Sequence, residues 1–369
     1  MATSISGKRK LTKKLWFPAV DRLRLLFFIQ LALAGCYGLH VDSIYEPTGL
    51  TYDCFWDPTV WKYYAFHAYL PFFVLTGFLS TYSLSAEKRQ YGSFHIIYYF
   101  WRRAIDLLPY YLVLAVVAVG YALFSANDAS LSIWALLPVT SAWHASIEWL
   151  PTSPVVWAFV PLGILFLFHL IWPICMWLIP SRGHLWLEIF LITLSLLFRA
   201  GFFTEDLPAP WHPLSAAFPL MLGALLGQQL LLHPSSFMRF RNYRKPIRLI
   251  VIPGSLICLF YLLIIPDFSH IHVMLELVFC SAALLLIAIE ASSFEETEGG
   301  RSFWKSGRWI LPATVGFAIA VELTYRSMLY YYVLLLGLAG AILCVFAVKS
   351  LSYSHFNAWK EKYTFRLRK

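Results

Sequence analysis

The sequence has few charged residues. Asp, Glu, Lys and Arg make up 13% of its 369 residues, whereas a soluble domain usually has about 25%. Hydrophobic residues make up 59%, and they gather in runs of about 20, the length that crosses a bilayer as a helix. These runs do not alternate with a period of two, as the strands of an outer-membrane barrel would. The composition therefore excludes an ordinary soluble domain and predicts an all-α polytopic membrane protein.

Several catalytic and metal-binding motifs are absent from the sequence. His270 and His272 are two residues apart, a spacing that does not place both side chains on one helix face, and no carboxylate or thiolate completes a zinc site. There is no glycine-rich phosphate loop and no nucleophile elbow. Five of the six cysteines lie in apolar runs and only Cys54 lies in a predicted outer loop. We therefore expect no metal cofactor and no disulfide framework, and interpret the cysteines as small buried hydrophobic residues.

The formal net charge of +9 has an uneven distribution along the chain. If successive apolar runs alternate in direction, all but three of the 29 lysines and arginines fall on one side of the membrane. The three on the other side are Lys62, Arg199 and Arg326. This asymmetry is typical of the positive-inside rule. It predicts cytoplasmic N- and C-termini, and it explains the basic charge without a nucleic-acid partner.

The apolar runs predict about ten transmembrane helices in one bundle. Residues 1–19 form a basic cytoplasmic tail, 20–348 a single multi-pass domain, and 349–369 a second basic tail. Basic tails of this kind suit the anionic cytoplasmic face of the lipid bilayer. The predicted spans cover about 20–39, 61–85, 104–125, 156–179, 185–203, 214–233, 249–266, 273–293, 309–325 and 328–348. The sixth contains Gly223 and Gly227, a spacing that allows close helix packing.

Ionisable side chains inside membrane spans are costly and are functional candidates by default. The predicted spans contain Asp106, His169, Glu188, Glu276, Glu290 and Glu322. Glu188 and Glu290 lie near the cytoplasmic ends, where their carboxylates can extend to the surface. His169 lies in the middle of its span, as either a proton carrier or a hydrogen-bonded structural residue. Glu276 lies nearer the outer side without a sequence-adjacent partner.

Arg102 and Arg103 stand at the predicted cytoplasmic start of the third span. Two arginines there can bind phosphate groups through paired hydrogen bonds. They can equally be anchors that follow the positive-inside rule. The sequence leaves both interpretations open.

Four short motifs follow one another in the first third of the chain. They are Asp21-x-x-Arg24, Phe72-Phe73-Val74-Leu75-Thr76-Gly77-Phe78, Arg102-Arg103 and Pro109-Tyr110. This series resembles the membrane-bound acyltransferase-3 family. The resemblance implies ten core helices with both ends of the chain in the cytoplasm. It also implies transfer of an acyl group, often acetyl from acetyl-CoA, to a hydroxyl of a glycan, lipid or secondary metabolite.

The resemblance also implies roles for individual residues. Arg24, Arg102 and Arg103 would bind the phosphates of acyl-CoA. The family's catalytic histidine follows the first-helix arginine after ten intervening residues, and that position is Gly35 here. His40 and His67 are therefore the candidates for a relocated general base, a function that accelerates a reaction by about 10²–10⁴-fold.

Two functional hypotheses follow. The first is a membrane-embedded O-acyltransferase with acyl-CoA as co-substrate and a small molecule or glycan as acceptor. The second is a catalytically silent acyltransferase-like subunit for binding, transport or assembly, because a fold does not imply an activity. A position of His40 in the same cavity as Arg102 would favour the enzyme.

Overall fold

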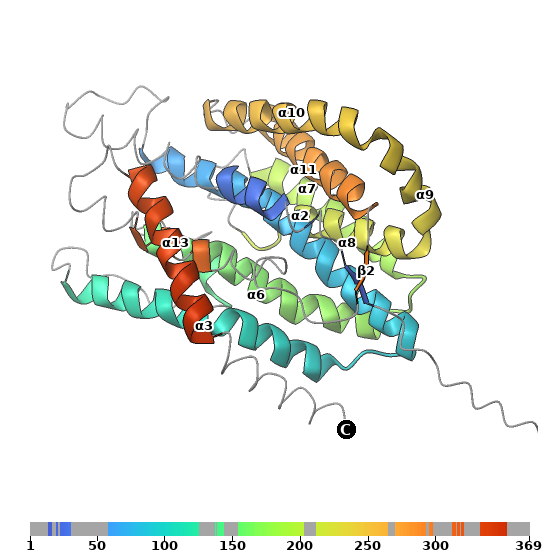
Figure 1. Ribbon diagram of the computed structural model, residues 1–369, viewed down its shortest axis with the longest axis horizontal. Helices are drawn as coiled ribbons and strands as arrows, with labels where there is room; N and C mark the ends of the chain where they lie inside the picture. Colours follow the sequence, from blue (N-terminus) through green and yellow to red (C-terminus); the bar gives the residue numbers. More distant parts are fainter. Residues whose placement is uncertain are drawn as a thin grey trace, which may run out of the picture.

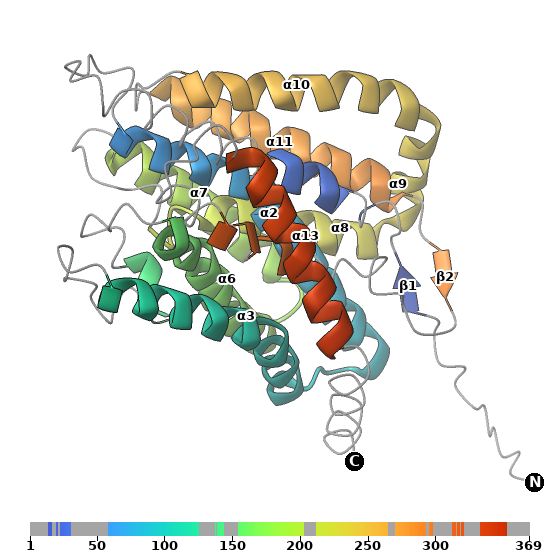
Figure 2. The same ribbon diagram turned by 60° about the vertical axis from the view of Figure 1, so that its left-hand side comes forward.

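The computed structural model is helical (Figure 1). It describes residues 14–16, 20, 23–30, 58–124, 137, 139–143, 154–202, 212–264, 270–292, 295–297, 312–314, 316–317, 319–320 and 333–352. The helices are α2 (Pro58–Tyr91), α3 (Ile96–Phe124), α6 (Pro154–Leu178), α7 (His184–Phe202), α8 (Ala217–Leu232), α9 (Pro234–Arg239), η3 (Phe240–Tyr243), α10 (Arg244–Ile264), α11 (His270–Ala291) and α13 (Val333–Ser352). Two short strands, β1 (Lys14–Trp16) and β2 (Glu295–Thr297), form one antiparallel pair. In both views α10 and α11 lie along one edge, α3 and α6 along the other, and α2 between them (Figures 1 and 2).

Four of the described helices are long and apolar enough to cross a membrane. Their apolar segments are Phe159–Leu178, His184–Gly201, Arg244–Leu262 and Val273–Ala291. On α7 and α10, large apolar side chains such as Phe190, Leu197 and Leu249 are exposed on the outer surface of the protein. A soluble protein would bury such surfaces, whereas lipid tails solvate them. The chain is therefore a helical membrane protein.

The turn between α2 and α3 is much shorter than the sequence predicted. Residues 86–103 were expected to form a cytoplasmic loop, but α2 continues to Tyr91 and α3 begins at Ile96. Gly92 has a φ of 79°, the left-handed conformation in which glycine commonly ends a helix. The sequence interpretation allowed residues 93–101 to lie as an amphipathic segment on the headgroups, and the structure makes this stretch part of α3 from Ile96 onward. Charged residues mark the edge of a predicted span, while a helix extends beyond that edge.

Two basic side chains near the end of α2 bind the ends of neighbouring helices. Lys88 Nζ donates to the Met176 carbonyl oxygen over 2.9 Å, and Arg89 Nη1 donates to the Leu231 carbonyl oxygen over 2.8 Å. The final carbonyl groups of a helix lack partners within it and carry partial negative charge. These contacts bring together the C-terminal ends of α2, α6 and α8, as expected for spans that run in the same direction.

Helices α2 and α8 touch through their backbones. A Cβ atom placed on Gly77 would collide with the Leu220 carbonyl group, and one placed on Gly223 would collide with Val74. A Cβ atom on Gly227 would lie 2.6 Å from the carbonyl oxygen of Phe78. The packing function predicted for the glycines of the sixth span is confirmed. The glycine of the Phe72–Phe78 motif belongs to the same contact, so this motif has a structural function.

The β1–β2 pair connects two segments far apart in the sequence. Lys14 is opposite Thr297, and Trp16 is opposite Glu295. Figure 2 shows the pair beside the α8–α9 end of the helices. The sequence predicted both segments on the cytoplasmic side, but it predicted no strand, because three-residue strands carry too weak a pattern to be recognised.

Aromatic contacts join the first predicted span to α2 and the third predicted span to α6. Phe27 contacts Phe72 of α2 edge to face, with ring centres 5.9 Å apart. Tyr111 of α3 contacts Phe159 of α6 at 5.1 Å, and this pair sets part of the antiparallel α3–α6 contact. The Tyr111–Phe159 contact thus holds α3 and α6 side by side, and the Phe27–Phe72 contact holds the first predicted span against α2.

Substitution of Gly77 or Gly223 by alanine is expected to destabilise the protein. The added methyl group would force the α2 and α8 backbones apart, and overpacking of this kind costs about 1–3 kcal/mol or more. Gly254→Ala is the matched control, because nothing lies within 4 Å of a Cβ placed there in α10; alanine at that position is expected to be neutral or stabilising by up to about 1 kcal/mol. Thermal unfolding in detergent measures the three variants. Equal stability of all three would contradict the close contact.

Candidate functional site

Three ionisable side chains from three helices meet inside the protein. His67 comes from α2, Arg199 from α7 and Glu276 from α11, and all three side chains are fully buried. His67 Nδ1 lies 2.7 Å from one carboxylate oxygen of Glu276. Arg199 forms an ion pair with the other oxygen. We call this group the His–Glu–Arg triad.

A second set of contacts holds Arg199 in place. Its guanidinium lies 5.3 Å from the centre of the Phe218 ring and donates to the Ser215 carbonyl oxygen over 3.4 Å. Ser195, one turn before Arg199 on α7, also donates to Ser215 and accepts a hydrogen bond from the Phe218 backbone N–H. Ala216, which precedes α8, provides no side-chain cap. Ser195 therefore caps α8 from a neighbouring helix and fixes the α7–α8 contact next to the triad.

The arrangement of the triad is suited to acid–base chemistry. Burial of a charge is costly unless the charge is paired, and here Glu276 has a cation on one oxygen and an imidazole on the other. A carboxylate beside one ring nitrogen of a histidine holds the orientation of the ring. Glu276 lies beside Nδ1 of His67, and the other ring nitrogen, Nε2, is the one that this contact leaves for a reacting group.

A second polar cluster joins α2, α3 and α6. The Tyr99 hydroxyl is hydrogen-bonded to His169 Nδ1 over 2.8 Å. The guanidinium of Arg103 lies 5.4 Å from the centre of the Tyr99 ring, and it donates to the Ser80 hydroxyl over 3.4 Å. The hydrogen bond predicted as one alternative for His169 is therefore present. Arg103 is part of an ordered cluster near the start of α3.

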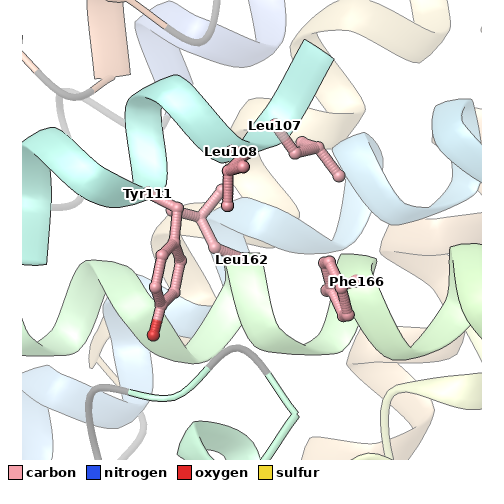
Figure 3. Close-up of a pocket in the computed structure, with 5 residues that line it drawn as sticks. All are labelled: Leu107, Leu108, Tyr111, Leu162 and Phe166. Carbon is pink, nitrogen blue, oxygen red and sulfur yellow. The ribbon is translucent and has the colours of Figure 1, made fainter. Parts of the chain in front are cut away.

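A small apolar hollow lies between α3 and α6. Figure 3 shows its lining, which comes from Leu107, Leu108 and Tyr111 of α3 and from Leu162 and Phe166 of α6. The space in it that a water-sized molecule can occupy is about 10 Å³, room for about one water molecule. The first of the lining residues, Leu107, lies four positions after Arg103, which is about one helical turn. The lining contains no charged side chain.

The sequence-predicted site residues fall in different places. His67 belongs to the triad, and Arg103 belongs to the Tyr99–His169 cluster. Arg102 and Arg24 are half-buried on α3 and on the first helix. His40 lies outside the described residues, as does Gly35, so the relation of His40 to Arg102 stays a prediction. Among the described residues, no group of three or more His, Cys, Asp or Glu side chains is arranged to hold a metal ion.

Two triad members were not identified as a pair from the sequence. Arg199 was counted only as one of three basic residues on the outer side, and Glu276 was noted as having no sequence-adjacent partner. The sequence did contain one indication of this contact. His67, Arg199 and Glu276 all lie in the outer halves of their predicted spans. Their shared depth made contact possible, although only the packing of the helices brings them together.

The two carboxylates predicted to extend to the cytoplasmic surface do not do so. Glu290 is buried and forms ion pairs with Arg244 and Arg248 of α10. Glu188 is completely buried within the protein. The prediction was wrong for both, because it considered depth in the membrane and not the direction in which each side chain points.

Glu276→Gln is expected to destabilise the protein by about 3–5 kcal/mol, since it leaves Arg199 buried without its counter-charge. The double variant Arg199→Met/Glu276→Gln is expected to recover part of this loss, because the uncompensated charge is then absent. Arg182→Gln, at an exposed turn, is the control and should have no measurable effect. Thermal unfolding in detergent gives the double-mutant cycle. Strictly additive effects of the two single changes would show that the ion pair has no energetic coupling.

Comparisons of the chain with models of protein families, with curated proteins and with solved structures found no match. A functional proposal therefore depends on the side chains described above and on the motifs in the sequence.

Proposed function

We propose that the protein is a membrane-embedded O-acyltransferase that uses acyl-CoA, with acetyl-CoA as the expected donor. The observation that carries this proposal is the buried His67–Glu276 contact, in which a carboxylate orients the imidazole that was a candidate base in the sequence. The four sequence motifs that resemble the acyltransferase-3 family support the same reaction class. We further propose about ten spans with both termini in the cytoplasm.

In the proposed reaction His67 is the general base. Its Nε2 takes the proton of an acceptor hydroxyl as the hydroxyl oxygen attacks the thioester carbonyl carbon. Glu276 stabilises the resulting imidazolium, and Arg199 keeps Glu276 ionised and in position. The carbon–sulfur bond then breaks, and the leaving CoA thiolate takes the proton from Nε2 of the His67 imidazolium, which returns the histidine to its neutral form. The acceptor is a small molecule or a glycan that approaches from the outer half of the membrane.

The proposed donor site lies at the cytoplasmic end of α3. Arg102 and Arg103 bind the anionic phosphates of CoA, with Arg24 as a further contact, because guanidinium groups match phosphate geometry. The hollow of Figure 3 lies further along α3 but has room for only about one water molecule, so the proposed donor site consists of the arginines and not of this hollow.

The second candidate function is a catalytically silent subunit that keeps the acyltransferase-like fold. Two observations favour it. The position of the family's histidine is Gly35, and His67 is fully buried beside an ion pair, an arrangement that also serves to hold α2, α7 and α11 together. The two functions differ in whether acyl-CoA binds and whether His67 affects turnover.

Acyl-CoA binding to the purified protein in detergent, measured by calorimetry, tests the donor site. The Arg102→Ala/Arg103→Ala variant is expected to bind at least about 100-fold more weakly, because each hydrogen bond to a charged group contributes about 1.5–3 kcal/mol. Arg182→Ala, which removes an exposed arginine elsewhere, should bind as the wild type does. If short-chain acyl-CoA does not bind the wild type, the enzyme proposal fails and the silent subunit remains.

Turnover measurements then test the base. His67→Ala is expected to lower kcat by about 10²–10⁴-fold without a change in acyl-CoA affinity, as loss of a general base would. His40→Ala is measured in parallel, because both histidines are candidates. Full activity of the folded His67→Ala protein would assign the reaction to another residue.

A further inference from the structure

Three glutamates are buried in the described helices, and two of them have opposite charges beside them. Glu276 lies between His67 and Arg199. Glu290 forms ion pairs with two arginines of α10. Glu188 differs from these two because no described ion pair involves it, and neither of its carboxyl oxygens has a hydrogen-bond partner in the described part of the chain.

Glu188 is enclosed by protein on all sides. Its side chain is 0% exposed, so it reaches neither water nor the lipid that surrounds α7. Glu188, Ser195 and Arg199 are seven and four residues apart, which places them on one face of the helix. Ser195 and Arg199 on this face contact α8 and α11. Glu188 therefore points into the protein interior, along the stripe that also carries Arg199.

No described charge compensates a carboxylate at this position. Arg199 lies eleven residues further along α7, or about 16 Å at 1.5 Å per residue. His184, one turn before Glu188, is hydrogen-bonded to the Ile179 carbonyl oxygen. Lys88 of α2 acts electrostatically on His184, but its ammonium group donates to the Met176 carbonyl oxygen. An isolated buried carboxylate costs far more free energy than its neutral acid, and such groups gain a proton instead of remaining charged.

We propose that Glu188 is a proton-binding site inside the protein, and that its carboxyl group carries a proton in the folded state at neutral pH. Membrane-embedded carboxyls that bind and release protons are the elements from which proton pathways are built. This function is separate from acyl transfer and does not depend on it. The triad and the Glu290 cluster are ion-paired, so they serve as internal comparisons.

A hydrophobic carbodiimide tests the proposal, because this reagent reacts with the neutral acid in an apolar environment. The acid proton moves to a carbodiimide nitrogen while the carboxyl oxygen bonds to the central carbon, and rearrangement gives a stable acylurea. The full-length protein in detergent is treated at neutral pH, and the labelled peptides are identified by mass spectrometry. We expect at least about tenfold more label on Glu188 than on Glu276 or Glu290, since the rate follows the population of the neutral acid. Labelling of Glu276 or Glu290 to at least the extent of Glu188 would overturn the proposal, provided that some label is found.

An infrared measurement covers the case in which the reagent does not reach Glu188. The wild-type spectrum minus that of Glu188→Gln should contain the carbonyl stretch of a neutral carboxylic acid. Glu290→Gln is the matched control, and its difference spectrum should contain the bands of an ionised carboxylate. Carboxylate bands in the Glu188→Gln difference would overturn the proposal, whatever the labelling result. Retention of the wild-type Tm by Glu188→Gln is expected as well, because glutamine is a neutral substitute of the same shape.

Discussion

The contact between the backbones of α2 and α8 positions most of the polar groups described above. Glycine at positions 77, 223 and 227 removes the side chains that would otherwise hold the two helices apart. At one end of this contact, α2 presents His67, while the turn before α8 provides the Ser215 carbonyl group that accepts from Arg199. At the other end, Arg89 of α2 binds the Leu231 carbonyl group of α8. A change in the spacing of these helices would therefore alter the triad and the helix ends together.

The three buried glutamates have three different environments. Glu276 is shared between a histidine and an arginine, Glu290 is held by two arginines, and Glu188 has no ionic partner among the described residues. Pairing makes a charge tolerable in the interior but also fixes it there, because separation of the pair would leave both charges exposed to an apolar environment. A carboxyl without a partner is less restricted, since a proton neutralises it and can leave again. This contrast separates structural ion pairs from a site able to exchange protons.

Helix positions were more predictable from the sequence than contacts between helices. Apolar runs predicted α6, α7, α10 and α11 to within several residues, because the hydrocarbon core sets both length and composition. The Gly223–Gly227 spacing also predicted a packing surface, although not its partner. The pairing of Glu276 with Arg199 was not predictable, since membrane insertion alone does not determine which helix faces meet. The same gap explains why Glu188, predicted to extend to the cytoplasmic surface, is instead buried.

The β1–β2 pair has a consequence for the order of assembly. Proteins are made from the N-terminus, and domains generally acquire structure during synthesis. Trp16 leaves the ribosome early, but its partner strand at Glu295–Thr297 follows the first eight predicted spans. The N-terminal strand therefore stays unpaired until residues 295–297 have been made, after those helices. The strand pair therefore forms after those helices have been made, and a translation product that stops before residue 295 lacks it.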